Sequence, residues 1–189
     1  MGAVYTAIHP TLKRTVIIKQ LKVKGSAAFA ERFKREARLL MDFRNEHVVQ
    51  VFDHFKDGSS YYIVMEYIDG VDLEHVLRDK RVISNEMAIV IFSEICRALK
   101  YAHDKGVIHR DIKPANILIS KDGLVKRVDF GIATSKEDSE EGLTRAGMAL
   151  GTPAYMSPEQ IVDTAGVDKR SDIYSMGVML YEMVTGQKP

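Results

Sequence analysis

The segment at residues 108–119, IHRDIKPANILI, places three polar side chains close together between apolar runs. Asp111, Lys113 and Asn116 could supply a carboxylate, a cation and an amide to one site. Pro114 prevents a simple helix through the middle, because proline lacks an N–H group and clashes with the preceding turn. We therefore predict a loop, held by its apolar flanks, that presents these three groups together.

A second carboxylate stands at the end of a predicted strand. Asp129 follows an apolar run and precedes Phe130 and Gly131. Mg²⁺ prefers oxygen ligands, and a carboxylate at a strand end beside a glycine is well placed to hold it. The pattern therefore predicts a Mg²⁺ site that includes Asp129. Each of these signals is weak alone, and their shared order and spacing along the chain give them weight.

Two further charged residues occupy predicted apolar faces. Lys19 shares a strand face with Ile17, and Glu36 lies between Phe33 and Leu40 on the apolar side of a predicted helix. Burying either charge alone would be costly, so we expect the two to pair across a strand–helix interface. The alternative is a pair of surface side chains that bury their stems and keep their charged ends in water.

The elements that must position these groups follow from the hydrophobic periodicity. A β-rich first part precedes a helical second part, with IDGVD at residues 68–72 as a connector and candidate domain boundary. Gly106 is placed to end a long helix, and the polar stretch at 131–152 reads as a long functional or disordered loop. We predict strands at 15–21, 47–55, 61–67, 117–120 and 124–128, and helices at 27–43, 85–105 and 172–185.

The composition is that of an ordinary globular protein. Of 189 residues, 46% are hydrophobic and 28% are charged, and the formal net charge is +1. This balance argues against nucleic-acid binding and against a polybasic membrane anchor. Cys96 is the single cysteine, so no internal disulfide can form and a reducing compartment is expected. No apolar run approaches the roughly 20 residues that a membrane span needs.

Taken in their order along the chain, these charged residues resemble the signature motifs of protein kinases. The resemblance covers essentially the whole chain. The resemblance implies an α+β, bilobal protein kinase fold. A small β-rich N-lobe would occupy residues 1–67 and lack its first strand. A mainly helical C-lobe would occupy residues 68–189 and lack its last helices.

The resemblance also implies catalytic roles. Asp111 would orient the incoming hydroxyl and accept its proton, while Lys113 would steady the γ-phosphate. Lys19 would hold the α- and β-phosphates of ATP, with Glu36 as its partner. The proposed ligands of Mg²⁺, with Mn²⁺ as an alternative, are Asn116 and Asp129.

Other residues match structural and nucleotide-binding positions of the family. His109 would be a packed structural histidine, and Asp172 would brace the catalytic loop from behind. Gly2 would be the last glycine of a glycine-rich loop. The residues implied to contact adenine or ribose are Val4, Met65, Glu66, Ile68, Asp72 and Leu118.

Two features favour serine or threonine as the phosphate acceptor. Lys113 is typical of serine/threonine kinases, and GTPAYMSPE at 151–159 is similar to their substrate-docking ledge. Thr152 would contact Asp111 and Lys113 there. The sequence around HRDIKPANILI is most similar to that of bacterial kinases of the eukaryotic type. A small-molecule kinase is disfavoured, because the ledge suits extended peptides.

The sequence departs from the family pattern at several points. It begins inside the glycine-rich loop and ends at TGQKP, so the expected arginine partner of Glu159 is absent and we expect a costly, uncompensated carboxylate. Ile17 replaces the usual alanine above adenine and could narrow the nucleotide slot. Met148 stands where the commonest activating phosphosite of the family lies.

Arg110, directly before the catalytic acid, indicates control by loop phosphorylation. We predict that Thr144 is the activating site and that its phosphate bridges Arg32 and Arg110. The alternative is that Thr144 is an ordinary solvated loop residue.

The expected activity is that of an ATP-dependent protein serine/threonine kinase in the cytoplasm, although this piece alone is expected to be inactive or poorly folded. Its expected partners are protein substrates and a second copy for trans-autophosphorylation, with any membrane anchor of the parent protein outside this segment. The competing interpretation is a pseudokinase or truncated module that binds partners without catalysis.

Overall fold

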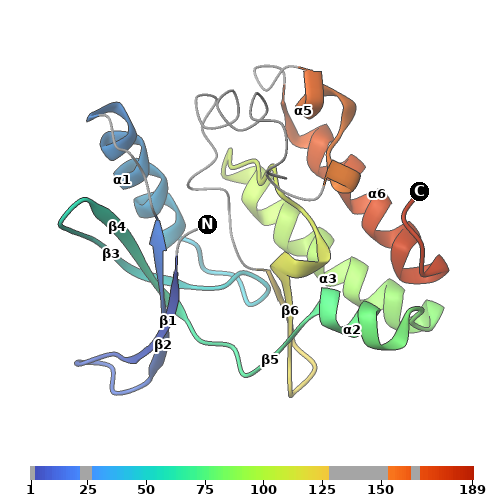
Figure 1. Ribbon diagram of the computed structural model, residues 1–189, viewed down its shortest axis with the longest axis horizontal. Coiled ribbons are helices and arrows are strands. Elements are labelled where there is room, and N and C mark those ends of the chain that lie inside the picture. The colour runs from blue at the N-terminus through green and yellow to red at the C-terminus, as the bar shows by residue number, and fades with distance from the viewer. Residues whose placement is uncertain (1–2, 22–26, 128–152, 163–166) are drawn as a thin grey trace. The chain divides into compact units, whose positions relative to one another are not determined.

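The computed structural model describes residues 3–21, 27–127, 153–162 and 167–189. The chain divides into two compact units, Met1–Asp69 and Gly70–Pro189. The first unit combines an antiparallel sheet with helix α1, and the second combines a smaller sheet with several helices (Figure 1). The predicted site residues Asp129, Thr144 and Thr152 lie outside the described residues.

The sheet of the first unit is antiparallel throughout. It confirms the strand predicted at 15–21, whereas the strand predicted at 47–55 begins only at residue 51. A strand at residues 4–8 was missed, because this stretch was interpreted as the end of a glycine-rich loop. In spatial order the strands are β1 (Val4–Ile8), β2 (Thr15–Leu21), β4 (Ser60–Glu66) and β3 (Val51–Asp57).

Helix α1 (Ala27–Met41) packs against β3 through one apolar stripe. Phe33, Ala37 and Leu40 are buried at helical spacing, which confirms the predicted apolar face. The ring of Phe33 lies 4.9 Å from the ring of Tyr61 on β4, within the range of favourable aromatic pairs. The core of this unit therefore forms between the helix stripe and the sheet.

The sheet of the second unit includes a segment that was predicted to be a connector. β5 (Gly70–Asp72) pairs antiparallel with β6 (Ile117–Ser120), which pairs with β7 (Val125–Arg127). The prediction failed because three residues carry no periodicity. Gly70 permits the pairing, since a Cβ there would lie 2.1 Å from the carbonyl oxygen of Ile119.

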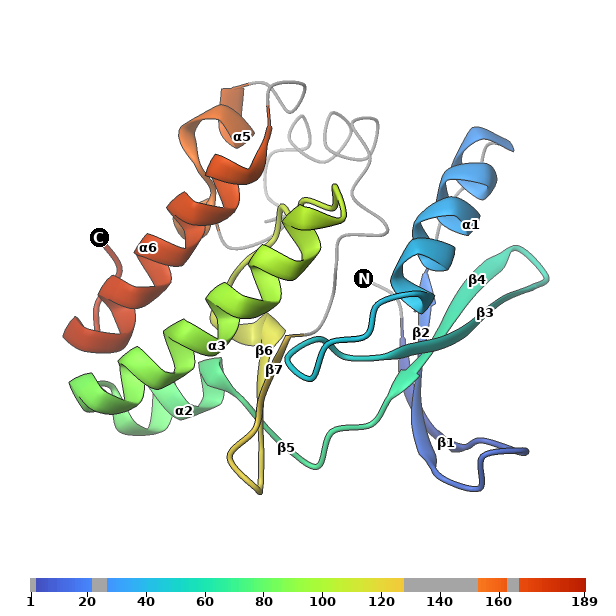
Figure 2. The same cartoon turned by 180° about the vertical axis from the view of Figure 1, so that it is seen from behind.

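Helices make up most of the described residues of the second unit. α3 packs against both α6 and β7, and Figures 1 and 2 show α3 alongside α6 from opposite sides. α6 begins three residues before the predicted start, because Asp168 caps it by accepting a hydrogen bond from the Arg170 amide at 2.8 Å. The helices are α2 (Leu73–Lys80), α3 (Asn85–Asp104), α5 (Pro158–Val162) and α6 (Lys169–Thr185), with 3₁₀ turns η1 (Pro114–Asn116) and η2 (Pro153–Tyr155).

An apolar core joins these elements, with Leu73, Ile95, Ile117, Met179 and Met183 almost completely buried. Within the described parts of the chain, no helix combines the length and the apolar character needed to cross a membrane.

The end of α6 provides a test of backbone conformation. Gly186 caps the helix at φ 71°, and an added Cβ would lie 2.9 Å from the Arg81 carbonyl oxygen and from the Val82 side chain. We expect Gly186→Ala to lower the free energy of unfolding by about 1–3 kcal/mol, since it adds left-handed strain to a close contact. Urea unfolding measures this.

The matched control is Gly177→Ala in the interior of α6, where an added Cβ would meet no described atom within 4 Å. Because alanine is the better helix former, this change should be neutral or stabilising by up to about 1 kcal/mol. Equal destabilisation by the two substitutions would contradict the argument.

Candidate active site

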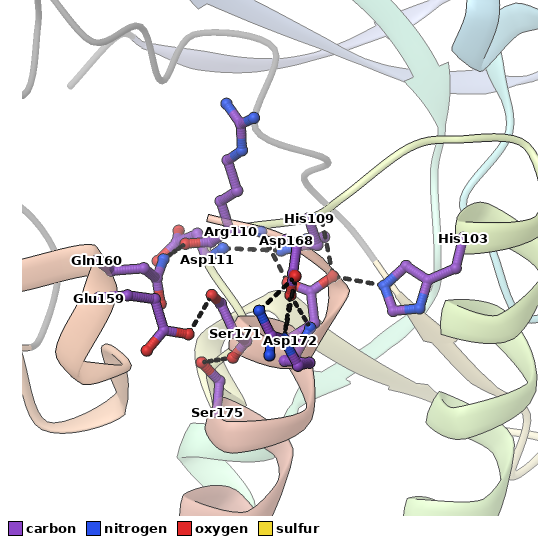
Figure 3. Close-up of polar contacts among 11 residues, drawn as sticks. His103, His109, Arg110, Asp111, Glu159, Gln160, Asp168, Ser171, Asp172 and Ser175 are labelled. Carbon is purple, nitrogen blue, oxygen red and sulfur yellow. Dashed lines mark hydrogen bonds and ion pairs between the residues drawn. The ribbon is translucent and has the colours of Figure 1, made fainter. Parts of the chain in front are cut away.

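A buried carboxylate holds the loop that carries the predicted catalytic residues. Asp172, in the first turn of α6, is only 1% exposed and accepts hydrogen bonds from the backbone amides of His109 and Arg110, each at 2.9 Å. His103 Nε2, from α3, lies 2.7 Å from the same carboxylate (Figure 3). The predicted position of Asp172 behind the loop is confirmed, whereas no sequence pattern indicated a contact with His103.

The backbone turns sharply at the next residues. Arg110 has φ 69°, in the left-handed region that non-glycine residues rarely adopt. His109 is fully buried, and its Nδ1 accepts a hydrogen bond from the Asp111 amide at 3.0 Å. In the neutral ring, the proton therefore lies on Nε2. These contacts confirm a structural role for His109 and direct the side chain of Asp111 away from the interior.

The three polar residues predicted to act together do meet. Lys113 Nζ lies 3.0 and 2.8 Å from the two carboxylate oxygens of Asp111. Asn116 Nδ2 donates to the Asp111 backbone carbonyl at 2.8 Å and to its carboxylate at 3.0 Å. Ile112, between Asp111 and Lys113, and Ile117, directly after Asn116, are buried in the core and hold the cluster there. The result is a half-exposed carboxylate with a cation and an amide on one side.

The first unit carries most of the predicted nucleotide-contacting residues. Met65 is buried on β4, between Ile17 of β2 and Val51 of β3 in the strand register. Val4 on β1 is exposed and lies opposite Lys19 on β2. Glu66 ends β4, and its backbone N–H donates to the Gln50 carbonyl oxygen at 2.9 Å.

Asp72 and Leu118 come together in the second unit, where they face each other in the register of β5 and β6. Asp72 has a role that the sequence did not reveal. It caps α2, since Oδ1 accepts a hydrogen bond from the His75 amide at 2.8 Å and Oδ2 lies 2.6 Å from His75 Nδ1. Any ribose contact by Asp72 would have to share the carboxylate with this cap.

Lys19 and Glu36 are both partly buried, and each already takes part in a polar or electrostatic interaction. The pairing of one with the other stays a prediction. The side chain of Arg32 lies outside the described residues, as does Gly2.

Sequence reasoning missed how the segment after residue 152 attaches to α6. Ser175 Oγ donates to the Tyr155 carbonyl oxygen at 2.6 Å, and Ser171 Oγ donates to Glu159 Oε1 at 2.5 Å. The Tyr155 hydroxyl donates to Glu182, and burial together with this carboxylate raises the pKa of Tyr155. One signal was present: two serines four residues apart interrupt an otherwise apolar helix face.

The prediction that Glu159 would be an uncompensated carboxylate is wrong. The Ser171 hydroxyl, followed by the Glu159 backbone amide and the Ser157 side chain, holds the pKa of Glu159 below its usual value. Hydrogen bonds from hydroxyl and amide groups are the largest cause of the lowered pKa, and the nearby charge of Arg170 lowers it further. The carboxylate is also not deeply buried, which lowers the cost of carrying a charge.

These contacts predict a pH-dependent effect of Ser171→Ala. A carboxyl group whose pKa is lowered on folding stabilises the protein above its unfolded pKa, and this contribution disappears as the pH falls through the folded pKa. The stability difference between wild type and Ser171→Ala should therefore be largest near neutral pH and shrink as the pH falls through the lowered pKa of Glu159. Urea unfolding at pH 7 and pH 3 measures the difference, and an unchanged value would contradict the assignment.

The family model for the protein kinase domain matches residues 1–189, and the chain belongs to this family. A solved structure of Rad53 residues 1–466 in complex with AMP-PNP is similar, with a TM-score of 0.80 and 30% sequence identity. The similarity covers 100% of this chain and 46% of that one. The α+β protein kinase fold predicted from the sequence is therefore confirmed.

Similar curated proteins include serine/threonine-protein kinases from bacteria. PknB of Mycolicibacterium smegmatis is 40% identical over 195 residues, which cover 100% of this chain and 31% of the relative. PknB of Mycobacterium tuberculosis shows the same identity and coverage. This chain is similar over its whole length to these serine/threonine-protein kinases, and it spans about a third of their length.

Proposed function

We propose that the protein carrying this chain transfers the γ-phosphate of ATP to serine or threonine hydroxyls of proteins. The observation that carries the proposal is the cluster of Asp111, Lys113 and Asn116, held on a buried anchor in a chain of this family. Phosphoryl transfer needs positioning and charge neutralisation more than covalent help, and this cluster offers both.

Asp111 is proposed to accept a hydrogen bond from the attacking hydroxyl and then to take its proton. Its carboxylate is half-exposed, so a hydroxyl can reach it, and its backbone is fixed by His109. Lys113 lies beside it with its ammonium group 2.8 Å away, close enough to balance the charge of an incoming phosphate.

ATP is proposed as the phosphate donor, in line with the AMP-PNP complex of Rad53. Lys19, supported by Glu36, would bind the α- and β-phosphates. Asp72 would contact the ribose with the same carboxylate that caps α2. The residues proposed to surround adenine are Val4, Met65, Leu118 and the backbone groups of Glu66 and Ile68.

Mg²⁺ is the proposed metal, with Mn²⁺ as an alternative, and would neutralise charge on the phosphates when bound. The donor chemistry of Asn116 fits, since Nδ2 faces Asp111 and the amide oxygen is the atom that suits a hard cation. The second proposed ligand, Asp129, lies outside the described residues. Among the described residues, no group of three or more His, Cys, Asp or Glu side chains is placed to hold a metal ion.

Further assignments belong to this proposal. The units at Met1–Asp69 and Gly70–Pro189 are proposed to be the N-lobe and C-lobe of a cytoplasmic kinase.

Phosphorylation of Thr144, bridging Arg32 and the exposed Arg110, is proposed to activate it, with Thr152 beside the catalytic loop. A second copy of the protein would act as its first substrate. Phosphopeptide mapping of the active protein tests this, and an unmodified Thr144 would exclude it.

The test of function uses the full-length protein with radiolabelled ATP, Mg²⁺ and a generic protein substrate. Label on phosphoserine and phosphothreonine supports the proposal. Nucleotide binding without any transfer would instead support the module that binds partners without catalysis.

A further inference from the structure

One side chain joins the segment after residue 152 to the catalytic loop. Gln160, on the short helix α5, donates a hydrogen bond from Nε2 to the backbone carbonyl oxygen of Arg110 at 2.7 Å. Its Oε1 accepts from the Ser157 amide at 3.0 Å and lies 3.2 Å from the Ser157 hydroxyl. Figure 3 shows Gln160 reaching the loop from the side of α5, while Asp172 lies on the α6 side.

Asp172 and Gln160 together bind both backbone polar groups of Arg110, a residue with a strained backbone conformation. The Arg110 N–H is bound by Asp172, and its C=O is bound by Gln160. A residue at φ 69° persists only where its surroundings over-determine it. Since Asp111 follows directly, the orientation of the Arg110 carbonyl sets the direction in which the Asp111 backbone leaves the turn.

The other end of the amide is equally fixed. Ser157 is fully buried, and the chain on either side of it is tied to α6 through Tyr155 and Glu159. The side-chain amide of Gln160 therefore spans from a segment anchored on α6 to the peptide group beside Asp111. Its donor and acceptor atoms are both used, so an amide is required at this position.

We propose that Gln160 is a positioning residue for phosphoryl transfer, which fixes the backbone before Asp111 relative to the segment at 153–160. The inference rests on the proposed function, and it adds a residue that belongs to none of the motifs used above. Because the segment at 153–159 is the predicted docking ledge, the same amide would keep the ledge and the catalytic acid in register.

The test compares three variants of the full-length protein. Gln160→Leu removes both hydrogen bonds, and Gln160→Glu keeps an oxygen for the Ser157 amide but loses the donor to Arg110. Ile161→Ala is the control, since Ile161 is exposed on the same helix and is 54% accessible to solvent. One hydrogen bond is worth about 0.5–1.5 kcal/mol, so kcat should fall roughly 2- to 10-fold in the Leu and Glu variants.

The KM for ATP should stay within about twofold in all variants, because Gln160 touches no proposed nucleotide residue. The Glu variant should be the slower of the two, since its carboxylate faces the Arg110 carbonyl oxygen. Amide hydrogen exchange in the peptide covering residues 107–113 should accelerate in the Leu and Glu variants and remain at the wild-type rate in Ile161→Ala.

The outcomes separate the two ideas. If the wild-type protein turns over normally, an unchanged kcat or an unchanged exchange rate in the Gln160 variants would overturn the inference. The proposed function would then remain intact. Absence of phosphoryl transfer by the wild-type protein would overturn the proposed function and the positioning role with it. A fall in kcat equal to that of Ile161→Ala would show only a general effect on α5 and would also overturn the inference.

Discussion

Asp111→Asn should reduce phosphoryl transfer by about 10²- to 10⁴-fold, the range expected for loss of a positioned general acid or base. The asparagine amide keeps the shape of the carboxylate but cannot take the proton of the attacking hydroxyl. One oxygen remains to accept from Lys113 or Asn116, which now lie within 3.0 Å of the carboxylate. The protein should therefore fold normally while turnover collapses.

The measurement is kcat with radiolabelled ATP, accompanied by a thermal unfolding curve. The KM for ATP should change little, because the proposed contacts of Asp111 are with the acceptor hydroxyl. Asp122→Asn, at the exposed turn between β6 and β7, is a matched control and should retain wild-type turnover. Wild-type kcat in Asp111→Asn would remove Asp111 from the proposed catalytic role.

Asp172→Ala should lower the free energy of unfolding by about 2–4 kcal/mol. The substitution leaves the buried amide of His109 and the partly buried amide of Arg110 without acceptors, and an orphaned buried donor costs about 1–3 kcal/mol. It also removes the hydrogen-bond partner of His103. Turnover should fall as well, since the left-handed turn before Asp111 loses its anchor.

The same helix offers a control of identical chemistry. Asp168 caps α6 and accepts from the Arg170 amide at 2.8 Å, but this contact is exposed to solvent. Asp168→Ala should therefore lower the free energy of unfolding by much less than Asp172→Ala, because water can replace the acceptor at an exposed N-cap. Urea unfolding of both variants measures the difference, and equal losses would show that Asp172 does not anchor the loop.

The loop that carries the proposed catalytic residues could be predicted from the sequence because its chemistry is local. Asp111, Lys113 and Asn116 lie within a few residues of each other, and their apolar neighbours reveal which groups turn inward. The position of Asp172 came from resemblance alone, since nothing within its own helix indicates what its carboxylate binds.

Other features escaped prediction because they depend on distant contacts. The strand at Gly70–Asp72 exists only because β6 supplies its partner, and its own residues carry no strand pattern. Gln160 binds a carbonyl oxygen 50 residues earlier in the chain, and Ser171 binds a carboxylate 12 residues earlier. A hydroxyl or amide side chain gives no indication in the sequence of which of many acceptors it will meet.

The anchoring of the loop by Asp172 has a consequence for synthesis on the ribosome. The acceptor for the Arg110 amide is translated 62 residues after Arg110 itself. Translation adds about 5–20 residues per second, so roughly 3–12 s pass between the synthesis of Arg110 and that of Asp172. Throughout this interval the contacts of Asp172 with the loop cannot form, so the observed geometry around Asp111 arises only once α6 has left the exit tunnel.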